Sequence, residues 1–237
     1  KKLDKIMKEL NGEAEVIYDV PIGNYIAVHE VFAHVNASTN EDCEKLLHAV
    51  LNATDIQKQR KTKNDPGDAI EQLEIIAWTS VSTAKSNPYP GLLTVRTIRN
   101  LLSVWDDDII EPAKSPYSIV YNSDSKRLLF NSMETLAIAS SESMQHMVFT
   151  EVLNSFAHLF KRLTAEEQRR AEDVILRMLS CMGDLVLTAP LEAGLEKIAD
   201  VLNNCNYSES AKAVLKAKSD LAKSIGKLNS RSTRVGK

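Results

Sequence analysis

Apolar side chains recur every three to four positions along most of the chain after Thr39. This spacing places them on one face of an α-helix. It predicts helices over residues 40–53, 68–84, 92–105, 126–140, 144–161, 164–182, 190–204 and from 208 onward. Most of the breaks between them are short, so consecutive helices are expected to pack antiparallel. The predicted fold class is mostly α, an antiparallel helical bundle built as stacked helical hairpins.

The first forty residues follow another pattern. After a short helix over residues 1–10, segments 15–20 and 25–35 are rich in β-branched and aromatic side chains, with a Pro–Gly turn signal between them. Two short extended segments are predicted, although the imperfect alternation in 25–35 leaves a helix open there. We expect residues 1–38 to form an N-terminal segment that could close a preceding β-type domain, and residues 39–237 to form the helical domain.

Two further features refine the helical part. Thr164 followed by Glu167 fits a capping box, in which each side chain binds the backbone amide of the other. Residues 73–80 and 133–140 read alike, each with a Ser-rich break after it, which suggests a repeated hairpin. The chain opens on Lys1 rather than Met, so we expect a fragment of a longer protein.

Two long polar stretches, 54–67 and 106–125, are predicted as exposed loops. The second contains an apolar and aromatic run of four residues: Tyr117, Ile119, Val120 and Tyr121. Loops on a rigid scaffold often carry function, and tyrosine is enriched at interface hot spots. The run is therefore a candidate interface, and tucking into the helical domain is the alternative.

The search for catalytic chemistry yields no candidate site. No phosphate-binding glycine loop, nucleophile elbow or HExxH zinc motif is present. Cys43 and His48 alone fall short of a zinc site, and Asp106–Asp108 with Glu111 lack the spacing of an EF-hand loop. We expect a non-enzyme with no cofactor, no metal and no small-molecule substrate.

Charge and cysteine content bear on partners and compartment. The net charge of −3 argues against a dedicated nucleic-acid binder, yet residues 211–237 are strongly basic and could contact lipid or nucleic acid. The 3 cysteines suit either a reduced interior or pairing through Cys43, because Cys181 and Cys205 are expected at opposite ends of a hairpin. Three Asn-x-Ser/Thr sequons, at Asn36, Asn52 and Asn206, are candidate N-glycosylation sites.

The stretch from about residue 42 to residue 183 resembles the helical region of the receptor-for-egg-jelly module of polycystin-1-like membrane proteins. The resemblance lies in the order of three predicted helices. A leucine-rich helix ends in a serine-rich stretch (128–143), a second helix follows (148–160), and a third begins with Leu-Thr-x-Glu at Leu163. It covers about 60% of the chain. The family's self-cleavage tripeptide, His-Leu-Thr/Ser, does not occur, so no cleavage site carries over.

The resemblance implies a glycosylated structural or interaction module on the extracellular face of a membrane, at a cilium, flagellum or gamete surface. It implies protein partners, such as a polycystin-2-type channel or an extracellular filament protein. The alternative is a cytoplasmic or viral helical scaffold whose basic C-terminal tail contacts nucleic acid or membrane lipid. Glycan occupancy separates the two hypotheses.

Overall fold

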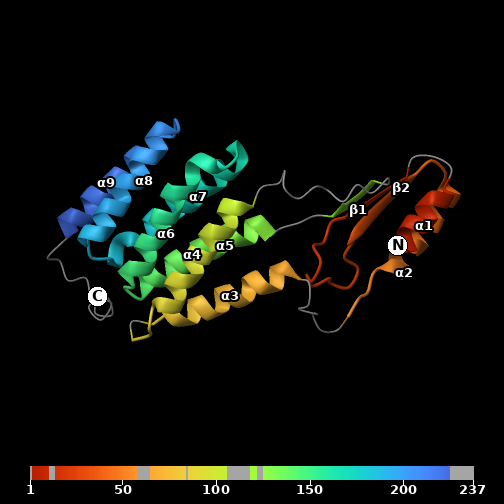
Figure 1. Ribbon diagram of the computed structural model, residues 1–237, viewed down its shortest axis with the longest axis horizontal. Helices are drawn as coiled ribbons and strands as arrows, with labels where there is room; N and C mark the ends of the chain where they lie inside the picture. Colours follow the sequence, from red (N-terminus) through yellow and green to blue (C-terminus); the bar gives the residue numbers. More distant parts are fainter. Residues whose placement is uncertain are drawn as a thin grey trace. The chain divides into compact units, whose positions relative to one another are not determined.

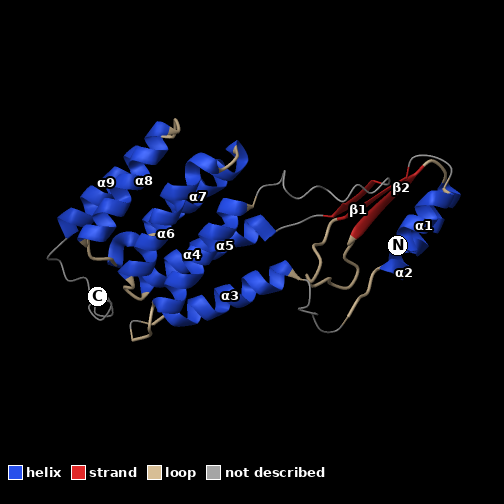
Figure 2. Ribbon diagram, in the orientation of Figure 1, coloured by secondary structure: helices blue, strands red, loops and turns tan. Residues whose placement is uncertain are grey.

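A computed structural model describes residues 2–10, 14–57, 65–83, 85–105, 118–121 and 125–224. The backbone divides into two compact units. Unit 1 comprises residues 1–69 and 106–125, and unit 2 comprises residues 70–105 and 126–237. In the described part of the chain strands occur only in unit 1, and the predicted mostly α fold is confirmed (Figure 2).

Unit 1 is a small sheet covered on one face by two helices (Figure 1). Its strands are β1 (Ala14–Tyr18), β2 (Ala33–Ala37) and β3 (Ser118–Tyr121), in the order β2-β1-β3. β1 pairs antiparallel with β2 and parallel with β3. Helices α1 (Lys2–Glu9) and α2 (Asn40–Ala53) supply Leu3, Met7, Leu46, Ala49 and Val50 to a core centred on Val16, which is fully buried.

Three sequence predictions change in unit 1. The chain segment 118–121 is a strand rather than part of a loop, and residues 24–32 form neither strand nor helix. The predicted boundary at residue 38 also differs from the observed division, because α2 packs on the sheet and belongs with it. Within α2, the predicted apolar stripe is buried at Leu46 and Val50, whereas Leu47 and Leu51 are nearly half exposed.

Unit 2 is a stack of helices around one apolar core (Figure 1). Its elements in the described residues are α3 (Pro66–Val81), whose first turn belongs to unit 1, then α4 (Tyr89–Val104), α5 (Ser125–Glu142), α6 (His146–Leu159), α7 (Ala165–Ser180), α8 (Ala189–Asn204) and α9 (Ser208–Ser224). Short 3-10 turns follow α6 and α7. Helix α6 packs against both α4 and α8, and α8 against α9.

The core of unit 2 is rich in phenylalanine. Phe130, Phe149, Phe156 and Phe160 are all at most 2% exposed. Phe130 of α5 stacks on Phe156 of α6 at a ring separation of 6.2 Å, and Phe160 meets Tyr207 edge to face at 5.2 Å. Aromatic pairs in these two geometries contribute beyond the area that they bury. They join α5 to α6 and the end of α6 to the start of α9.

Side-chain caps fix the starts of two helices, and the capping box predicted at Thr164 is one of them. The Thr164 capping box is present in both directions, with Glu167 Oε2 accepting from the Thr164 amide at 2.9 Å. Thr39 caps α2 by accepting from the Asp42 amide. Pro66 and Gly67 end the predicted loop 54–67, but α3 begins at Pro66, because Asp65 accepts the Asp68 amide at 3.1 Å and proline is tolerated in a first helical turn.

Candidate functional site

The predicted interface run lies at the edge strand of unit 1. Tyr117 is outside the described residues, and Ile119, Val120 and Tyr121 form most of β3. Ile119 faces α1 and α2 and packs against the unit 1 core. Val120 and Tyr121 remain 47% and 55% exposed. The run therefore divides into one anchoring side chain and two that are available to a partner.

The stacking of two tyrosines holds this edge in place. Tyr121 pairs in register with Tyr18 of β1, and their rings are parallel within 3° at a centroid separation of 4.9 Å. Such a stacked pair adds about 0.5–1.5 kcal/mol beyond area burial. It attaches a four-residue strand to β1 and presents the outer surface of the Tyr121 ring to solvent.

The face of the sheet opposite α1 and α2 carries alternating polar and apolar side chains. Glu15 and Ile17 of β1 lie on this face, because strand side chains alternate and Val16 points to the core. Ser118 donates to Glu15 at 3.1 Å, and Val120 lies beside Ile17 in the register. Asn36 of β2 lies opposite Glu15 and is exposed. One of the three sequon asparagines is thus on a strand rather than in a loop.

The other two sequon asparagines lie at helix ends. Asn52 is in the last turn of α2, and Asn206 is in the turn between α8 and α9 with a φ of 69°. Both side chains are exposed. All three candidate glycosylation sites are therefore sterically open, two of them on unit 1 and one on unit 2.

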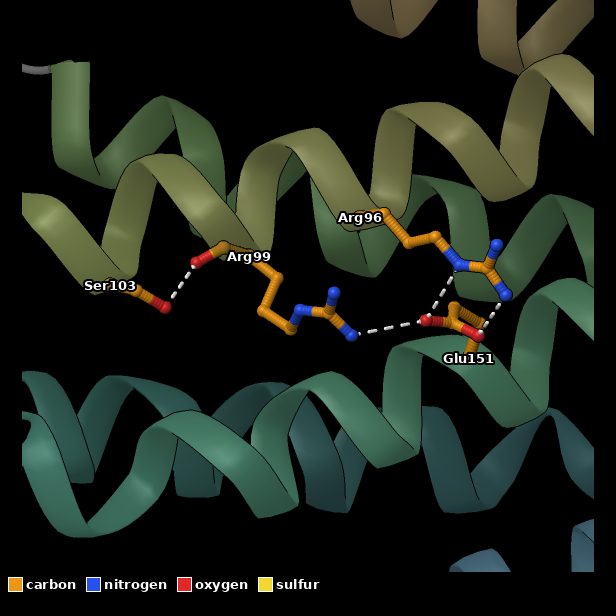
Figure 3. A network of polar contacts seen from close by, with 4 residues as sticks. All are labelled: Arg96, Arg99, Ser103 and Glu151. Atoms are coloured by element: carbon orange, nitrogen blue, oxygen red, sulfur yellow. Dashed lines mark hydrogen bonds and ion pairs between the residues drawn. The ribbon is translucent and has the colours of Figure 1, made fainter.

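An ion network that the sequence did not suggest joins α4 to α6 (Figure 3). The Glu151 carboxylate accepts from Arg96 Nε and Nη2, both at 3.2 Å, and from Arg99 Nη1 at 3.3 Å. Hydrogen bonding to Glu151 raises the pKa of Arg96 further above its ordinary value. The Glu151 side chain is only 15% exposed, so this network has a structural role in fixing two helices. A separation of more than fifty residues leaves no local sequence signal for it.

A second carboxylate links α5 to the start of α7. Glu167 accepts from Lys126 Nζ of α5 at 2.7 Å and closes the Thr164 capping box. Burial raises the pKa of Glu167, but the hydrogen bonds from Lys126 and Thr164 outweigh it and hold the pKa below the usual value. Glu167 is therefore ionised at neutral pH and fixes the helix start against α5.

A hollow of about 190 Å³ lies between α5 and α7. Its walls include Arg127, Arg170 and Arg177 over a floor of Phe130 and Val174. Arg177 is held by both oxygens of Glu134, at 2.6 and 2.9 Å, and Arg170 by Glu166 at 2.6 Å. These carboxylates, together with Asp173 in the wall, balance the arginine charges. The hollow has no net charge that would select an anion.

The described residues cover some of the remaining chemical predictions and not others. The acidic run at Asp106–Asp108 lies outside the described residues. Among the described residues no group of three or more His, Cys, Asp or Glu side chains is placed to hold a metal ion. Cys43, Cys181 and Cys205 are free thiols, each half-buried. No helix among the described residues is both long and apolar enough to cross a bilayer.

The described part of the basic C-terminal segment is largely paired with acids. On α9, Lys212 contacts Glu209 at 2.7 Å, and Lys218 contacts Glu196 at 2.6 Å. Lys223 lies 3.7 Å from Asp220. Residues 225–237, which carry the rest of the predicted basic tail, lie outside the described residues.

Comparison of the chain with protein-family models, with curated proteins and with solved structures finds no match.

Proposed function

We propose that this chain is a non-catalytic interaction module in the extracellular part of a polycystin-1-like cell-surface glycoprotein. The observation that carries the proposal is the exposure of all three sequon asparagines, Asn36, Asn52 and Asn206. A glycan needs an exposed asparagine in a secreted or surface chain. The resemblance of residues 42–183 to receptor-for-egg-jelly modules supports the same class of protein.

The helical unit suits a role that depends on shape. Its core is continuous from α3 to α9, and the Glu151 network and the phenylalanine stacks tie its helices together. Rigid helical stacks offer faces large enough for a stable protein interface, about 800 Å² per partner. In this proposal unit 2 is the scaffold.

The proposed contact surface for a protein partner is the edge of the sheet at β3, where Val120 and Tyr121 project from opposite faces. Val120 and Tyr121 are each about half exposed, and both are anchored through the register of β3 on β1. Tyrosine on a fixed strand loses little conformational entropy when a partner covers it. A polycystin-2-type channel and an extracellular filament protein are the partners that the family resemblance suggests.

Glycan occupancy on the protein from its own cells tests the proposal. The chain is purified with an antibody and its glycans are removed by a glycosidase in ¹⁸O-water, which converts each occupied asparagine to labelled aspartate. We expect label at Asn36, Asn52 or Asn206, and none at the exposed Asn204, which is not in a sequon. Label at none of the three contradicts the proposal and supports the cytoplasmic scaffold.

Partner binding is tested separately, in cells that express the chain or its variants together with the partner. We expect Val120→Ser and Tyr121→Ser to lower co-purification of a polycystin-2-type channel from co-expressing cells by about tenfold each, because each removes about 1.4 kcal/mol of apolar contact. Val104→Ser is the matched control, since Val104 is exposed and lies outside unit 1. Equal co-purification of all variants contradicts this contact surface.

A further inference from the structure

The 6 methionines of the chain divide into two groups by exposure. Four are at most 4% exposed and belong to the cores of the two units: Met7, Met133, Met178 and Met182. The other two, Met144 and Met147, are 53% and 63% exposed. Both lie where α5 joins α6, in a segment that we name the α5–α6 turn, residues 143–147. This turn therefore presents two thioethers to solvent within four residues.

The backbone at Met144 has a conformation that methionine rarely adopts. Its φ is 61°, in the left-handed region. The Met144 amide donates to the Ser141 carbonyl at 3.1 Å, and the Gln145 amide donates to the Ser140 carbonyl at 2.7 Å. This is the hydrogen-bond pattern of a Schellman motif, in which glycine usually occupies the left-handed position. Packing does not require methionine there, because more than half of the side chain is exposed.

Side-chain hydrogen bonds hold the turn against the end of α3. Ser143 Oγ donates to the Val81 carbonyl, and Gln145 Nε2 donates to the Thr83 carbonyl at 3.2 Å. The turn is thus fixed to unit 2 on both sides of Met144. The two thioethers are accessible in the folded chain itself, and no local unfolding is needed to reach them.

The start of α6 accommodates a polar acceptor near these side chains. Its N-cap residue, Gln145, makes no side-chain capping hydrogen bond. The Met147 amide makes no hydrogen bond to the described part of the chain. Free amides make a helix start electropositive, which favours partly negative oxygen atoms nearby. An oxygen atom added to either sulfur therefore lies in solvent, at a helix end that tolerates it.

We infer that Met144 and Met147 form a paired oxidation site that takes one oxygen atom each from a hydroperoxide. Each sulfur attacks the nearer peroxide oxygen with a lone pair, so that the S–O bond forms as the O–O bond breaks. The sulfur loses two electrons, and with hydrogen peroxide the remaining oxygen leaves as water after taking up the proton. Oxidation of this kind disrupts a core when the thioether is buried, and sulfoxide reductases reverse it. The inference is independent of the proposed function, since it depends only on the exposure of the two sulfurs.

Peptide mapping of the full chain after treatment with hydrogen peroxide tests the site. A thiol reductant is added before digestion to reverse cysteine sulfenic acids and disulfides, and it leaves sulfoxides in place. Trypsin releases Met144 and Met147 together with Met133, in the peptide of residues 128–161, so that the buried Met133 is an internal control. We expect both exposed methionines to gain oxygen at least about tenfold faster than Met133, because a buried thioether reacts only in opened molecules. Equal rates at the three sulfurs, or no oxygen at the exposed pair, overturn the inference.

Stability and reversal test whether the fold accepts the modification. We expect the chain with both sulfoxides to unfold at the same urea concentration as the untreated chain. The two methionine sulfoxide reductases, one for each sulfoxide epimer, should remove both oxygen atoms from the folded chain. Met144→Leu and Met147→Leu should each take up one oxygen fewer in this peptide, because leucine keeps the apolar bulk without the sulfur. A lower urea midpoint after oxidation, or sulfoxides that the reductases leave in place, contradicts a reversible site on the folded chain.

Discussion

Replacing Gly91 with alanine adds one methyl group in the first turn of α4, against Val81 at the end of α3. A Cβ at this position lies 2.4 Å from Val81 Cγ1, 3.3 Å from Ser80 Oγ and 3.5 Å from Val148 Cγ2. Val81 is fully buried and its branched side chain has little freedom to turn away. The two helices, or the Val81 side chain, must therefore move.

The size of the effect follows from two opposing contributions. Overpacking of a dense core costs about 1–3 kcal/mol. Exchange of glycine for alanine in a helix recovers up to about 1 kcal/mol. Gly91→Ala is therefore expected to destabilise unit 2 by about 1–2 kcal/mol. For a chain of this size that lowers the melting temperature by about 2–8 °C.

Gly194→Ala is the matched control, because it makes the same chemical change within α8. Its nearest neighbour is Thr150 Cγ2 at 3.5 Å, an ordinary van der Waals distance. The propensity gain is then unopposed, and we expect Gly194→Ala to be neutral or stabilising by up to about 1 kcal/mol. The Gly91→Ala chain should therefore be less stable than the Gly194→Ala chain by at least about 1 kcal/mol.

Urea unfolding followed by circular dichroism measures both variants. A double-mutant cycle with Val81→Ala tests the cause, since removal of Cγ1 removes the closest contact. We expect Val81→Ala to cost about 1–2 kcal/mol less in the Gly91→Ala background than in the wild type, the size of the relieved overpacking. Equal stability of the Gly91→Ala and Gly194→Ala chains, or strict additivity in the cycle, refutes the reasoning.

Three further predictions concern polar contacts. Thr164→Ala removes the capping box of α7 and should cost about 1 kcal/mol in urea unfolding, while Thr164→Ser restores most of it. Glu151→Gln deprives two arginines of their shared carboxylate and should lower the free energy of unfolding by about 1.5–3 kcal/mol. A decrease below about 0.5 kcal/mol contradicts a structural role for this network. Burial lowers the pKa of His146, so the folded state favours the neutral imidazole over the protonated one. Its contribution to stability is complete above the unfolded pKa of 6.5 and declines as pH falls from there toward the folded pKa. His146→Gln should flatten the dependence of stability on pH below 6.5, and an unchanged profile opposes this origin.

The interface prediction shows how far a sequence pattern extends. The run from Tyr117 to Tyr121 was recognised from residue type alone, with interface anchoring and burial as alternatives. The structure decides between these two alternatives for each residue. Ile119 packs against the unit 1 core, whereas Val120 and Tyr121 stay about half exposed. Alternation along the strand separates Val120 from Ile119, and it applies only once a strand is known to form. Tyr121 lies on the same face as Ile119, where its ring stacks on Tyr18 and stays half exposed.

The helices can be predicted from the sequence because their hydrogen bonds are local. Capping residues such as Thr39 and Thr164 act within four residues of their partners, so they are visible in the printed chain. The mostly α class followed from the repeated stripe, and it holds for the described residues. The predicted family and compartment stay predictions.

Tertiary structure alone decided the parts that depend on distant partners. Strand β3 pairs with β1 across about a hundred residues, and four residues of a polar stretch carry no local signal for that pairing. The same holds for the Arg96–Glu151 contact and for the assignment of α2 to the sheet. A helix satisfies its backbone within its own turns, whereas a strand or an ion network is completed only by a segment that the fold brings alongside.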